Sequence, residues 1–318
     1  MIYPIKTKPV FKQYLWGGSN LKTMFGKSIP DDFAAESWEI SCHDDGLSFV
    51  ANGEYEGKTL KDVIFSDKEK MLGNCNADSF PLLVKILDAS DKLSVQVHPD
   101  DEYAAKHENG ERGKTEMWYV INAKPGAHLV YGLKQGTTKE DFSDAVKNNT
   151  LENILNYVPV KKGDSFFIPS GTVHAICEGL LIAEIQQSSN TTYRVYDYNR
   201  VGKDGKTREL HVDKAKDVIN YSFSPNNNTI REEKYNWGSS KELCSCEFFT
   251  VVKYIVSDKC EIQAKKNKFE MLVFTEGSGY IGYDGMKYEF RSGDSFFIPA
   301  AIDKYTICGN CEFLRSFE

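Results

Sequence analysis

The sequence predicts a mainly β protein built from two related β-barrels, and three observations support this prediction. The heptapeptide Gly-Asp-Ser-Phe-Phe-Ile-Pro occurs twice, at 163–169 and at 293–299, and an identical run of this length indicates two copies of one structural unit. A second matching pair, Lys-Thr-Glu-Met at 114–117 and Lys-Phe-Glu-Met at 268–271, precedes the two copies. Tyr and Phe are abundant, and many short apolar runs end at Gly or Pro, as β-strands do.

The two copies divide the chain into two predicted domains, 1–235 and 236–318. The segment 222–240 between them is rich in Asn, Ser, Pro and charged residues, which is typical of a linker. The stretch between the matching segments is roughly twice as long in the first copy as in the second. Thr137 and Glu140 match a capping box in this extra length. We therefore predict a small helical insertion at about 137–158.

Alternation of apolar and polar residues and the positions of turn residues predict the other elements in order. Strands are expected at 33–41, 82–87, 93–98, 116–121, 128–131, 165–168, 175–177, 181–186 and 192–196, and the chain after 246 is expected to be strands with Gly turns. Helices are expected at 57–72, 100–107 and 211–219.

Charge and hydropathy exclude several classes of function. The net charge of -7 and the pI near 5.5 argue against a nucleic-acid partner, which needs a basic face. No apolar run approaches the roughly 18 residues that span a bilayer, and residues 1–6 lack the apolar region of a secretory signal. We expect a cytoplasmic protein that binds no membrane and acts on a small molecule. The sequence contains no signal for an oligomeric state.

The eight cysteines form only two close pairs, Cys244 with Cys246 and Cys308 with Cys311. Free thiols are expected in a reducing cytosol. A four-cysteine zinc site that joins the two pairs is the alternative, although the one-residue spacing of the first pair is poor for zinc.

Polar residues in and near the predicted strands of the first copy indicate a metal site. In a strand, alternate side chains share a face, so Ser94, Gln96 and His98 point one way while the intervening valines point the other. Glu116 in the next copied segment and His174, five residues after the repeated proline, add a carboxylate and an imidazole. Amide, carboxylate and imidazole donors suit Zn²⁺ with open positions for substrate. The second copy has lysine in place of this histidine, at position 304, so we predict that its barrel is metal-free.

Several long segments resemble the type I mannose-6-phosphate isomerases, in their short bacterial form. They are Pro-Leu-Leu-Val-Lys-Ile-Leu-Asp at 81–88, Leu-Ser-Val-Gln-Val-His-Pro-Asp-Asp at 93–101, Gly-Lys-Thr-Glu-Met-Trp-Tyr at 113–119 and the run at 184–197 that ends in Tyr-Arg-Val-Tyr-Asp. The resemblance implies two cupin-like barrels of the jelly-roll type and a zinc enzyme that interconverts mannose 6-phosphate and fructose 6-phosphate. It also implies one Zn²⁺ per chain, with the ligands Gln96, His98, Glu116 and His174, and Arg194 as a catalytic arginine.

Roles for the neighbouring residues follow from the chemistry of aldose–ketose isomerisation through an enediolate, which needs a fixed cation and a base that reaches both carbons. Arg194 would be the cation, and Lys114, on the same strand face as Glu116, would assist. Glu184 would be the base. The alternative for Lys114 and Glu184 is a mutual ion pair across the barrel.

Ser94 and Arg200 are candidates for binding the phosphate, since arginine forms bidentate pairs with phosphate. The alternative for Arg200 is an ordinary charge on a solvated loop. Two other functions stay open for the whole chain: a non-catalytic sugar-binding cupin, and a different metal-dependent cupin enzyme, such as an epimerase or an iron oxygenase.

Overall fold

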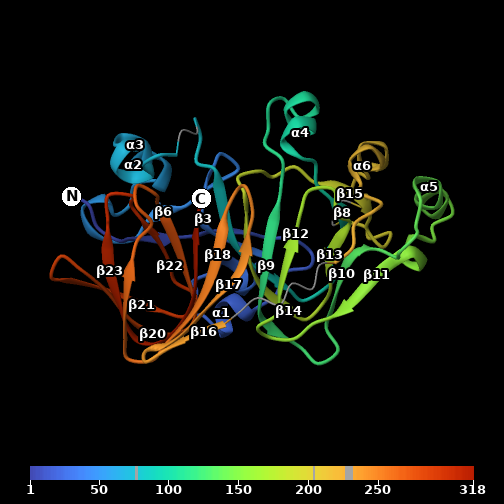
Figure 1. The fold of residues 1–318 in the computed structure, drawn as a ribbon. Coiled ribbons are helices and arrows are strands. Elements are labelled where there is room, and N and C mark those ends of the chain that lie inside the picture. The colour runs from blue at the N-terminus through green and yellow to red at the C-terminus, as the bar shows by residue number, and fades with distance from the viewer. Residues whose placement is uncertain (76–77, 203–204, 226–231) are drawn as a thin grey trace.

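The computed structural model describes residues 1–75, 78–202, 205–225 and 232–318, and it confirms a mainly β protein. Three large antiparallel sheets account for most of the strands (Figure 1). The ten-stranded sheet forms one side of the molecule, and the five- and six-stranded sheets form the other. Within these ranges, no helix combines the length and the apolar composition needed to cross a bilayer.

The ten-stranded sheet joins the two ends of the chain, because β1 pairs with β22. Its main path runs through β16 (Glu232–Tyr235), β17 (Gly238–Ser245), β18 (Thr250–Val256), β23 (Lys304–Phe317), β20 (Glu270–Tyr283), β22 (Ser295–Ile298), β1 (Ile5–Lys8) and β6 (Phe49–Val50). β19 (Lys259–Gln263) pairs with β23, and β21 (Met286–Arg291) pairs with β20. Residues near both chain ends therefore share this sheet, and the predicted boundary near residue 235 stays a prediction.

The other two large sheets hold the strands that surround the predicted metal site. The five-stranded sheet has the order β11 (Leu155–Pro159), β10 (His128–Leu133), β13 (His174–Ile176), β8 (Val95–Val97) and β15 (Tyr193–Tyr196). The six-stranded sheet has the order β12 (Ser165–Ile168), β9 (Glu116–Ala123), β14 (Leu180–Gln187), β7 (Leu82–Ala89), β3 (Glu36–Ile40) and β2 (Val10–Lys12).

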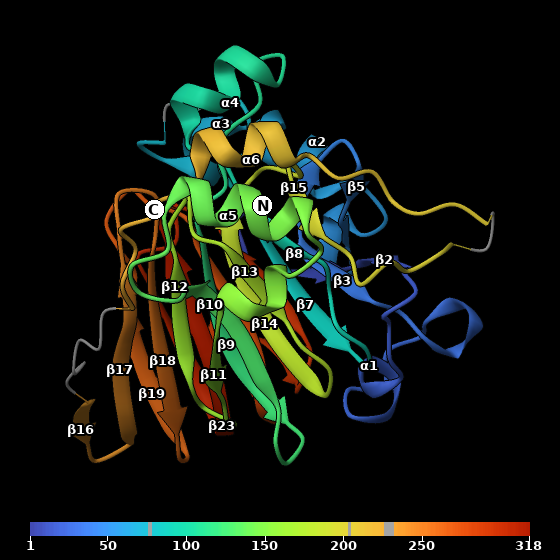
Figure 2. The ribbon, with the colours of Figure 1, turned by 90° about the vertical axis from the view of Figure 1, so that its right-hand side faces the viewer.

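Short helices and one small hairpin complete the described chain. The helices are α1 (Asn20–Thr23), α2 (Leu60–Ser66), α3 (Lys68–Leu72), α4 (Asp101–His107), α5 (Lys139–Lys147) and α6 (Val212–Val218), with 3-10 turns η1 (Pro30–Asp32), η2 (Gly53–Tyr55) and η3 (Leu151–Ile154). β4 (Cys42–His43) pairs with β5 (Gly46–Leu47). Most of the helices lie along one end of the sheets (Figures 1 and 2).

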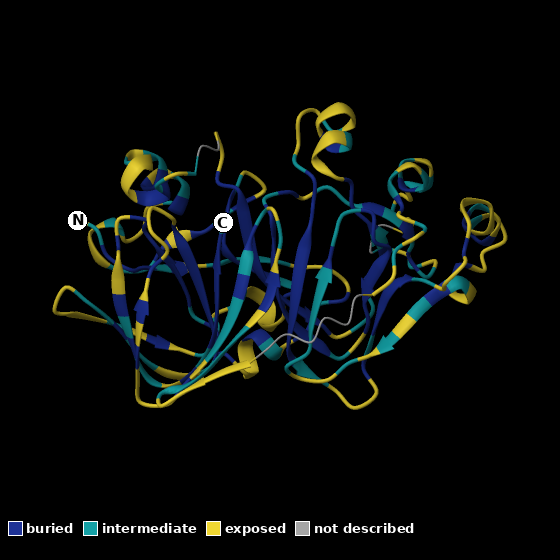
Figure 3. Ribbon diagram, viewed as in Figure 1, coloured by how far each residue is buried: buried dark blue, intermediate teal, exposed yellow. Residues whose placement is uncertain are grey.

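The six-stranded sheet is the middle layer of the molecule, and its central strands β9, β14, β7 and β3 are largely buried on both faces (Figure 3). On β9, Met117 and Tyr119 pack into a core shared with the ten-stranded sheet. Trp118 and Val120, which point the other way, pack against the five-stranded sheet. The outer face of the five-stranded sheet is covered by α5 and α6 through a fourth apolar cluster. The strand period of two thus builds a continuous stack of layers.

Several expectations about the fold need correction. The sheets are not closed barrels: within the described residues, no pairing joins the edges of the five- and six-stranded sheets, which instead face each other through side chains. In the insertion at 137–158, only α5 and the 3-10 turn η3 are helical, because 155–159 alternates and pairs with β10 as β11. The capping box is formed by Thr138 and Asp141, one position later than expected.

The linker expected at 222–240 is wrong in part. The strands β16 and β17 begin inside it and pair as a hairpin through Tyr235 and Gly238. Residues 226–231 of this segment lie outside the described residues.

In the second copy of the repeat, a buried ion pair holds the carboxylate that corresponds to Glu116. Arg315 forms a bidentate pair with Glu270: Arg315 Nε donates to Glu270 Oε2 at 2.9 Å, and Arg315 Nη2 donates to Glu270 Oε1. The Tyr305 hydroxyl donates to Glu270 Oε2 at 2.8 Å. All three side chains are buried. Lys304 points outward instead and pairs with the exposed Glu261.

We predict that Arg315→Met lowers the free energy of unfolding by about 3–5 kcal/mol, because it leaves the Glu270 charge buried without its main partner. The double change Glu270→Leu with Arg315→Met should recover most of this loss, since it removes both charges. Chemical denaturation measures both effects, with the exposed Arg291→Ala as the matched control. Equal destabilisation by the single and double changes would contradict this account of the pair.

Candidate metal centre and active site

Strand register in the five-stranded sheet aligns three of the predicted site residues in one row. His174 of β13 lies opposite Gln96 of β8, and Gln96 lies opposite Arg194 of β15. The neighbouring Val95 and Val97 point the other way, into the core under α5 and α6. The alternation expected for 94–98 is therefore confirmed. The polar side chains of this row face the six-stranded sheet.

The facing sheet supplies Glu116, and His98 follows the end of β8. His98, Glu116 and His174 form the one group of His, Cys, Asp and Glu residues in the described chain that could hold a metal ion. Their ligand atoms all lie within 4.8 Å of one another, and all three residues are buried. Glu116 Oε1 lies 3.3 Å from His98 Nε2, and Glu116 Oε2 lies 3.7 Å from His174 Nε2.

Backbone carbonyls fix the orientation of both imidazole rings. His98 Nδ1 lies 2.9 Å from the carbonyl oxygen of Thr191, and His174 Nδ1 lies 2.9 Å from that of Thr172. A carbonyl oxygen only accepts hydrogen bonds, so each Nδ1 carries the proton and donates it. In a neutral ring, the Nε2 lone pair then points into the cluster, as in metal-bound histidines.

The charges of the cluster match this assignment. Burial, assisted by the positive charge of Lys114, lowers the pKa of His98 to about 3, and burial also lowers the pKa of His174. Burial would raise the pKa of Glu116, but the positive charge of Lys114 outweighs burial and holds this pKa well below the ordinary value. The cluster therefore consists of two neutral imidazoles and one carboxylate near neutral pH.

Two buried polar atoms of the cluster, Glu116 Oε2 and His174 Nε2, have no hydrogen-bond partner among the residues that the structure describes. Leaving such atoms unsatisfied costs free energy, and both can serve as metal ligands. Lys114 brings an ammonium group into contact with the cluster, through bonds to Glu116 Oε1 and, at 3.3 Å, to His98 Nε2. The donor set and its two unpartnered atoms fit a divalent cation.

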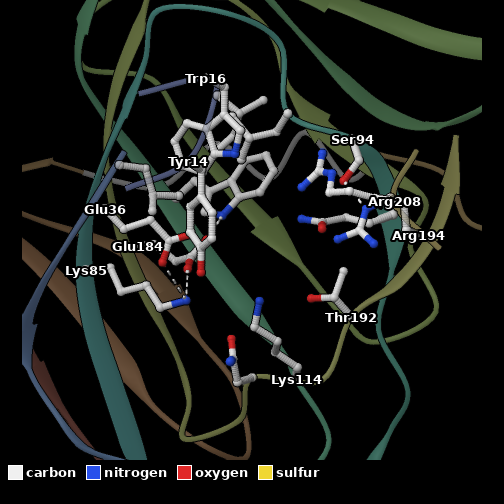
Figure 4. Close-up of a pocket in the computed structure, with 16 residues that line it drawn as sticks. Tyr14, Trp16, Glu36, Lys85, Ser94, Lys114, Glu184, Thr192, Arg194 and Arg208 are labelled. Carbon is white, nitrogen blue, oxygen red and sulfur yellow. Dashed lines mark hydrogen bonds and ion pairs between the residues drawn. The ribbon is translucent and has the colours of Figure 1, made fainter. Parts of the chain in front are cut away.

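A cavity of about 290 Å³ opens beside the cluster (Figure 4). Its size suits a small polar ligand. It is lined by Tyr14, Trp16, Glu36, Lys85, Leu87, Leu93, Ser94, Gln96, Lys114, Trp118, Ile176, Glu184, Asn190, Thr192, Arg194 and Arg208.

One wall of the cavity carries a second charged cluster, from the neighbouring strands β7, β14 and β3. Lys85 lies 3.4 Å from Glu184 Oε1 and 3.7 Å from Glu36 Oε2. Glu184 Oε2 also accepts a hydrogen bond from Trp118 Nε1 at 2.8 Å. Burial and the charge of Glu116 raise the pKa of Glu184, while Lys85 opposes this shift. A carboxyl group with a raised pKa can exchange protons with a substrate.

The opposite wall carries arginines (Figure 4). Arg194 Nε donates to Ser94 Oγ at 3.2 Å, and Arg194 Nη1 donates to the Glu209 carbonyl at 3.0 Å. Arg208 lies on the same wall. Arg200 does not line this cavity; it lines a smaller one beside it and is bonded to Asp197.

The structure therefore brings together eight of the nine predicted site residues, with Arg200 behind the others. The pairing expected as the alternative for Lys114 and Glu184 is not found, because Lys114 bonds to Glu116 and Glu184 pairs with Lys85. Within the described chain the cysteines form no disulfide and no four-cysteine metal cluster.

Sequence reasoning missed several cavity residues. Lys85 had a signal, since it is the one charged residue in the apolar run Leu82–Leu87. Glu36 lies inside the strand expected at 33–41, without a pattern of its own. Arg208 lies in a loop and had no signal.

Comparison with known proteins identifies the family. Residues 5–128 match the family model of the phosphomannose isomerase type I catalytic domain, and residues 239–318 match that of the mannose-6-phosphate isomerase cupin domain. Mannose-6-phosphate isomerase ManA of Bacillus subtilis is 41% identical over 313 residues, which cover 98% of both chains. The chain belongs to the type I phosphomannose isomerase family.

Other relatives extend this family match across the chain. Mannose-6-phosphate isomerase of Streptococcus mutans is 39% identical over 99% of this chain and 98% of its own. The crystal structure of the mannose 6-phosphate isomerase from Bacillus subtilis superimposes with a TM-score of 0.93 at 38% identity, over 98% of this chain and 99% of that one. The resemblance seen in the sequence is thus confirmed, and so is a cupin domain at 239–318.

We predict that His174→Ala weakens binding of a divalent cation by on the order of tenfold or more, since loss of even an outer-shell partner of a ligand has an effect of this size. Dialysis against buffered free Zn²⁺ followed by metal analysis measures the effect. The exposed His107→Ala is the matched control and should bind as the unchanged protein does. Equal metal content in the His174→Ala and control proteins would show that the ion binds elsewhere.

Proposed function

We propose that this protein is a zinc-dependent isomerase that interconverts mannose 6-phosphate and fructose 6-phosphate. The observation that carries the proposal is the buried His98–Glu116–His174 cluster beside a cavity with one acid–base wall and one arginine wall. The family membership agrees with it, because full-length relatives carry the name mannose-6-phosphate isomerase. We expect the enzyme to work in the cytoplasm.

Gln96, His98, Glu116 and His174 would hold the zinc ion. Gln96 lines the cavity and lies opposite His174 across the sheet, so its amide oxygen would complete a set of nitrogen and oxygen ligands. When bound, the ion polarises substrate oxygens and so lowers the barrier to removing the neighbouring C–H proton.

Glu184 is proposed as the base that takes the proton from C2 of the aldose and returns it to C1. Its raised pKa, together with its place on the cavity wall, supports this role. Lys85 and Trp118 hold its two oxygens, so the carboxylate is oriented before substrate arrives. A base that is already oriented avoids the cost of ordering it in the transition state.

Arg194 and Lys114 are proposed to stabilise the negative charge of the enediolate. Arg194 stays protonated in proteins and therefore acts as a fixed cation, and it lies across the cavity from Glu184 (Figure 4). Lys114 lies beside the ligands His98 and Glu116, where an ammonium can hydrogen-bond a substrate oxygen near the ion.

Ser94 is proposed to bind the phosphate. Its oxygen accepts the hydrogen bond from Arg194, so its own hydroxyl proton is available for a phosphate oxygen. Arg200 was expected to bind the phosphate as well. It pairs with Asp197, which places it at the same end of the cavity as Ser94 and supports a role in phosphate binding there.

Two cupin-like units of common origin are proposed for the chain, with the metal in 1–235 and none in 236–318. The repeated heptapeptide supports the common origin. In the second unit the carboxylate that corresponds to Glu116 is Glu270, which pairs with Arg315, and the sequence 236–318 contains no histidine to join it as a ligand.

The proposed activity can be tested by a coupled assay of mannose 6-phosphate turnover before and after chelation. We expect turnover to disappear when metal analysis shows that zinc has been removed, and to return when zinc is added back. Binding of sugar phosphate without turnover by the zinc-loaded protein would instead favour a non-catalytic sugar-binding function.

We predict that Glu184→Gln lowers kcat by on the order of 10² or more, the usual loss when a general base is removed. KM and zinc content should change little, since Lys85 keeps Glu36 as a partner and the metal ligands are untouched. The exposed Glu289→Gln is the matched control. Near-normal kcat in a zinc-loaded Glu184→Gln protein would eliminate Glu184 as the base.

A further inference from the structure

Two consecutive glutamines, Gln186 and Gln187, end the strand β14, and both are buried. Gln186 lies opposite Glu116 in register. Directly opposite residues of antiparallel strands point their side chains to the same face, so Gln186 faces the side of the sheet that carries the metal cluster. Neither glutamine is among the described residues that line the cavity beside the cluster. The groups that these two amides hold must therefore explain why they are buried here.

Gln187 holds the main chain between two residues of the site. Its Oε1 accepts a hydrogen bond from the backbone N–H of Thr115 at 2.9 Å. Its own backbone N–H donates to the Thr115 carbonyl oxygen at 3.1 Å. Thr115 stands between Lys114 and Glu116 in the sequence. These bonds therefore fix the backbone from which the ammonium and the carboxylate of the cluster extend.

Asp101, the first residue of α4, holds the other end of the same segment. Gln187 Nε2 donates to the Asp101 carboxylate, at 3.0 Å to Oδ1 and at 3.2 Å to Oδ2. The same Oδ1 accepts a hydrogen bond from the backbone N–H of Gly113 at 2.7 Å. A side chain does not fit at Gly113, because its Cβ would lie 2.5 Å from the carbonyl carbon of Asp100. The segment 113–115 is thus fixed at both of its ends.

Gln186 holds the loop that orients the ring of His98. Gln186 Nε2 donates to two carbonyl oxygens, that of Gln187 at 2.7 Å and that of Ser189 at 2.8 Å. Ser189 Oγ accepts a hydrogen bond from the backbone N–H of Thr191 at 3.2 Å. The carbonyl oxygen of Thr191 in turn accepts the Nδ1 proton of His98. The amide of Gln186 is therefore connected to the imidazole ring through this loop.

We propose that Gln186 and Gln187 are positioning residues of the metal centre. Gln187, anchored by Asp101, sets the direction of the Glu116 carboxylate. Gln186 sets the direction of the His98 ring through the loop. Both act through the ligands and not by contact with a substrate, and outer partners of metal ligands govern affinity in this way. The inference rests on the proposed function for the identity of the ion as zinc, but not for the isomerase reaction.

The first test is the zinc affinity of Gln187→Met, measured by competition with a chelator. We expect the dissociation constant to rise about tenfold or more, the usual effect of losing an outer partner of a ligand. The matched control is Gln263→Met, which removes an exposed amide that donates to the Asp303 carbonyl at 2.8 Å. A second control is Ile307→Ala, which opens the buried core of the ten-stranded sheet. It should lower stability and leave zinc affinity unchanged, so that lost stability alone cannot explain the result.

Exchanging the amide and the carboxylate tests the bonds of Gln187 themselves. Gln187→Glu removes the amide donor and places a second carboxylate beside Asp101, so zinc binding should weaken. Adding Asp101→Asn restores the pattern with the roles exchanged. The new carboxylate can accept from Thr115, and the new amide can donate to it while its oxygen still accepts from Gly113. The double change should recover most of the lost affinity. Affinity as low as that of Gln187→Glu alone would overturn the role of Gln187.

A double-mutant cycle tests the role of Gln186. Its Oε1 has no hydrogen-bond partner among the described residues, so direct contact of this oxygen with the ion is the competing explanation. Gln186→Met and Ser189→Ala should each weaken zinc binding, and Gln186→Met should have little further effect in the Ser189→Ala background, since both act through the loop. An equal effect of Gln186→Met in both backgrounds would overturn the positioning role.

Measuring zinc binding and turnover on the same proteins separates this proposal from the proposed function. If the unchanged protein binds zinc but does not turn over mannose 6-phosphate, the isomerase assignment fails, and weaker zinc binding by the two glutamine variants still supports their positioning role. If the unchanged protein turns over the substrate, and Gln186→Met and Gln187→Met bind zinc as it does, the positioning role fails and the isomerase assignment stands.

Discussion

The Glu116 carboxylate is fully buried and charged, and the arrangement of the site depends on balancing that charge. A buried carboxylate is costly unless cations and hydrogen-bond donors surround it. The two imidazoles turn Nε2 lone pairs toward it, because backbone carbonyls hold their Nδ1 protons, and so they donate no hydrogen bond to it. Lys114 supplies one positive charge. Within the described residues, Glu116 Oε2 and His174 Nε2 still lack hydrogen-bond partners, and a divalent cation would satisfy both atoms.

Charged side chains also give the two walls of the cavity different chemical properties. The rows of the two facing sheets place Lys85 and Glu184 on one wall and Arg194 on the other, with the cluster between them. In the proposed reaction, proton exchange would take place on one side of the substrate and anion binding on the other. In the segment 236–318, Arg315 neutralises the charge of Glu270, and Tyr305 donates a hydrogen bond to the same carboxylate.

Much of the site could be predicted from the sequence because strand alternation is a local property. Ser94, Gln96 and His98 were placed on one face by their spacing, and the structure has them so. Contacts between distant strands were less accessible. Lys85 reaches Glu184 through the register of β7 with β14, and Arg208 reaches the cavity from a loop with no periodicity. Closure of a sheet into a barrel depends on pairing between edge strands, which the repeated heptapeptide does not specify. At 155–159, pairing with β10 outweighed the expected helix.

X-ray absorption at the zinc edge of the zinc-loaded protein tests the central claim most directly. The account predicts only nitrogen and oxygen ligands, at about 2.0–2.2 Å, with the scattering pattern of two imidazole rings. A sulfur shell at about 2.3 Å, which would place the ion among the cysteines, or a spectrum without two ordered imidazoles, would contradict the assignment of the ion to His98, Glu116 and His174.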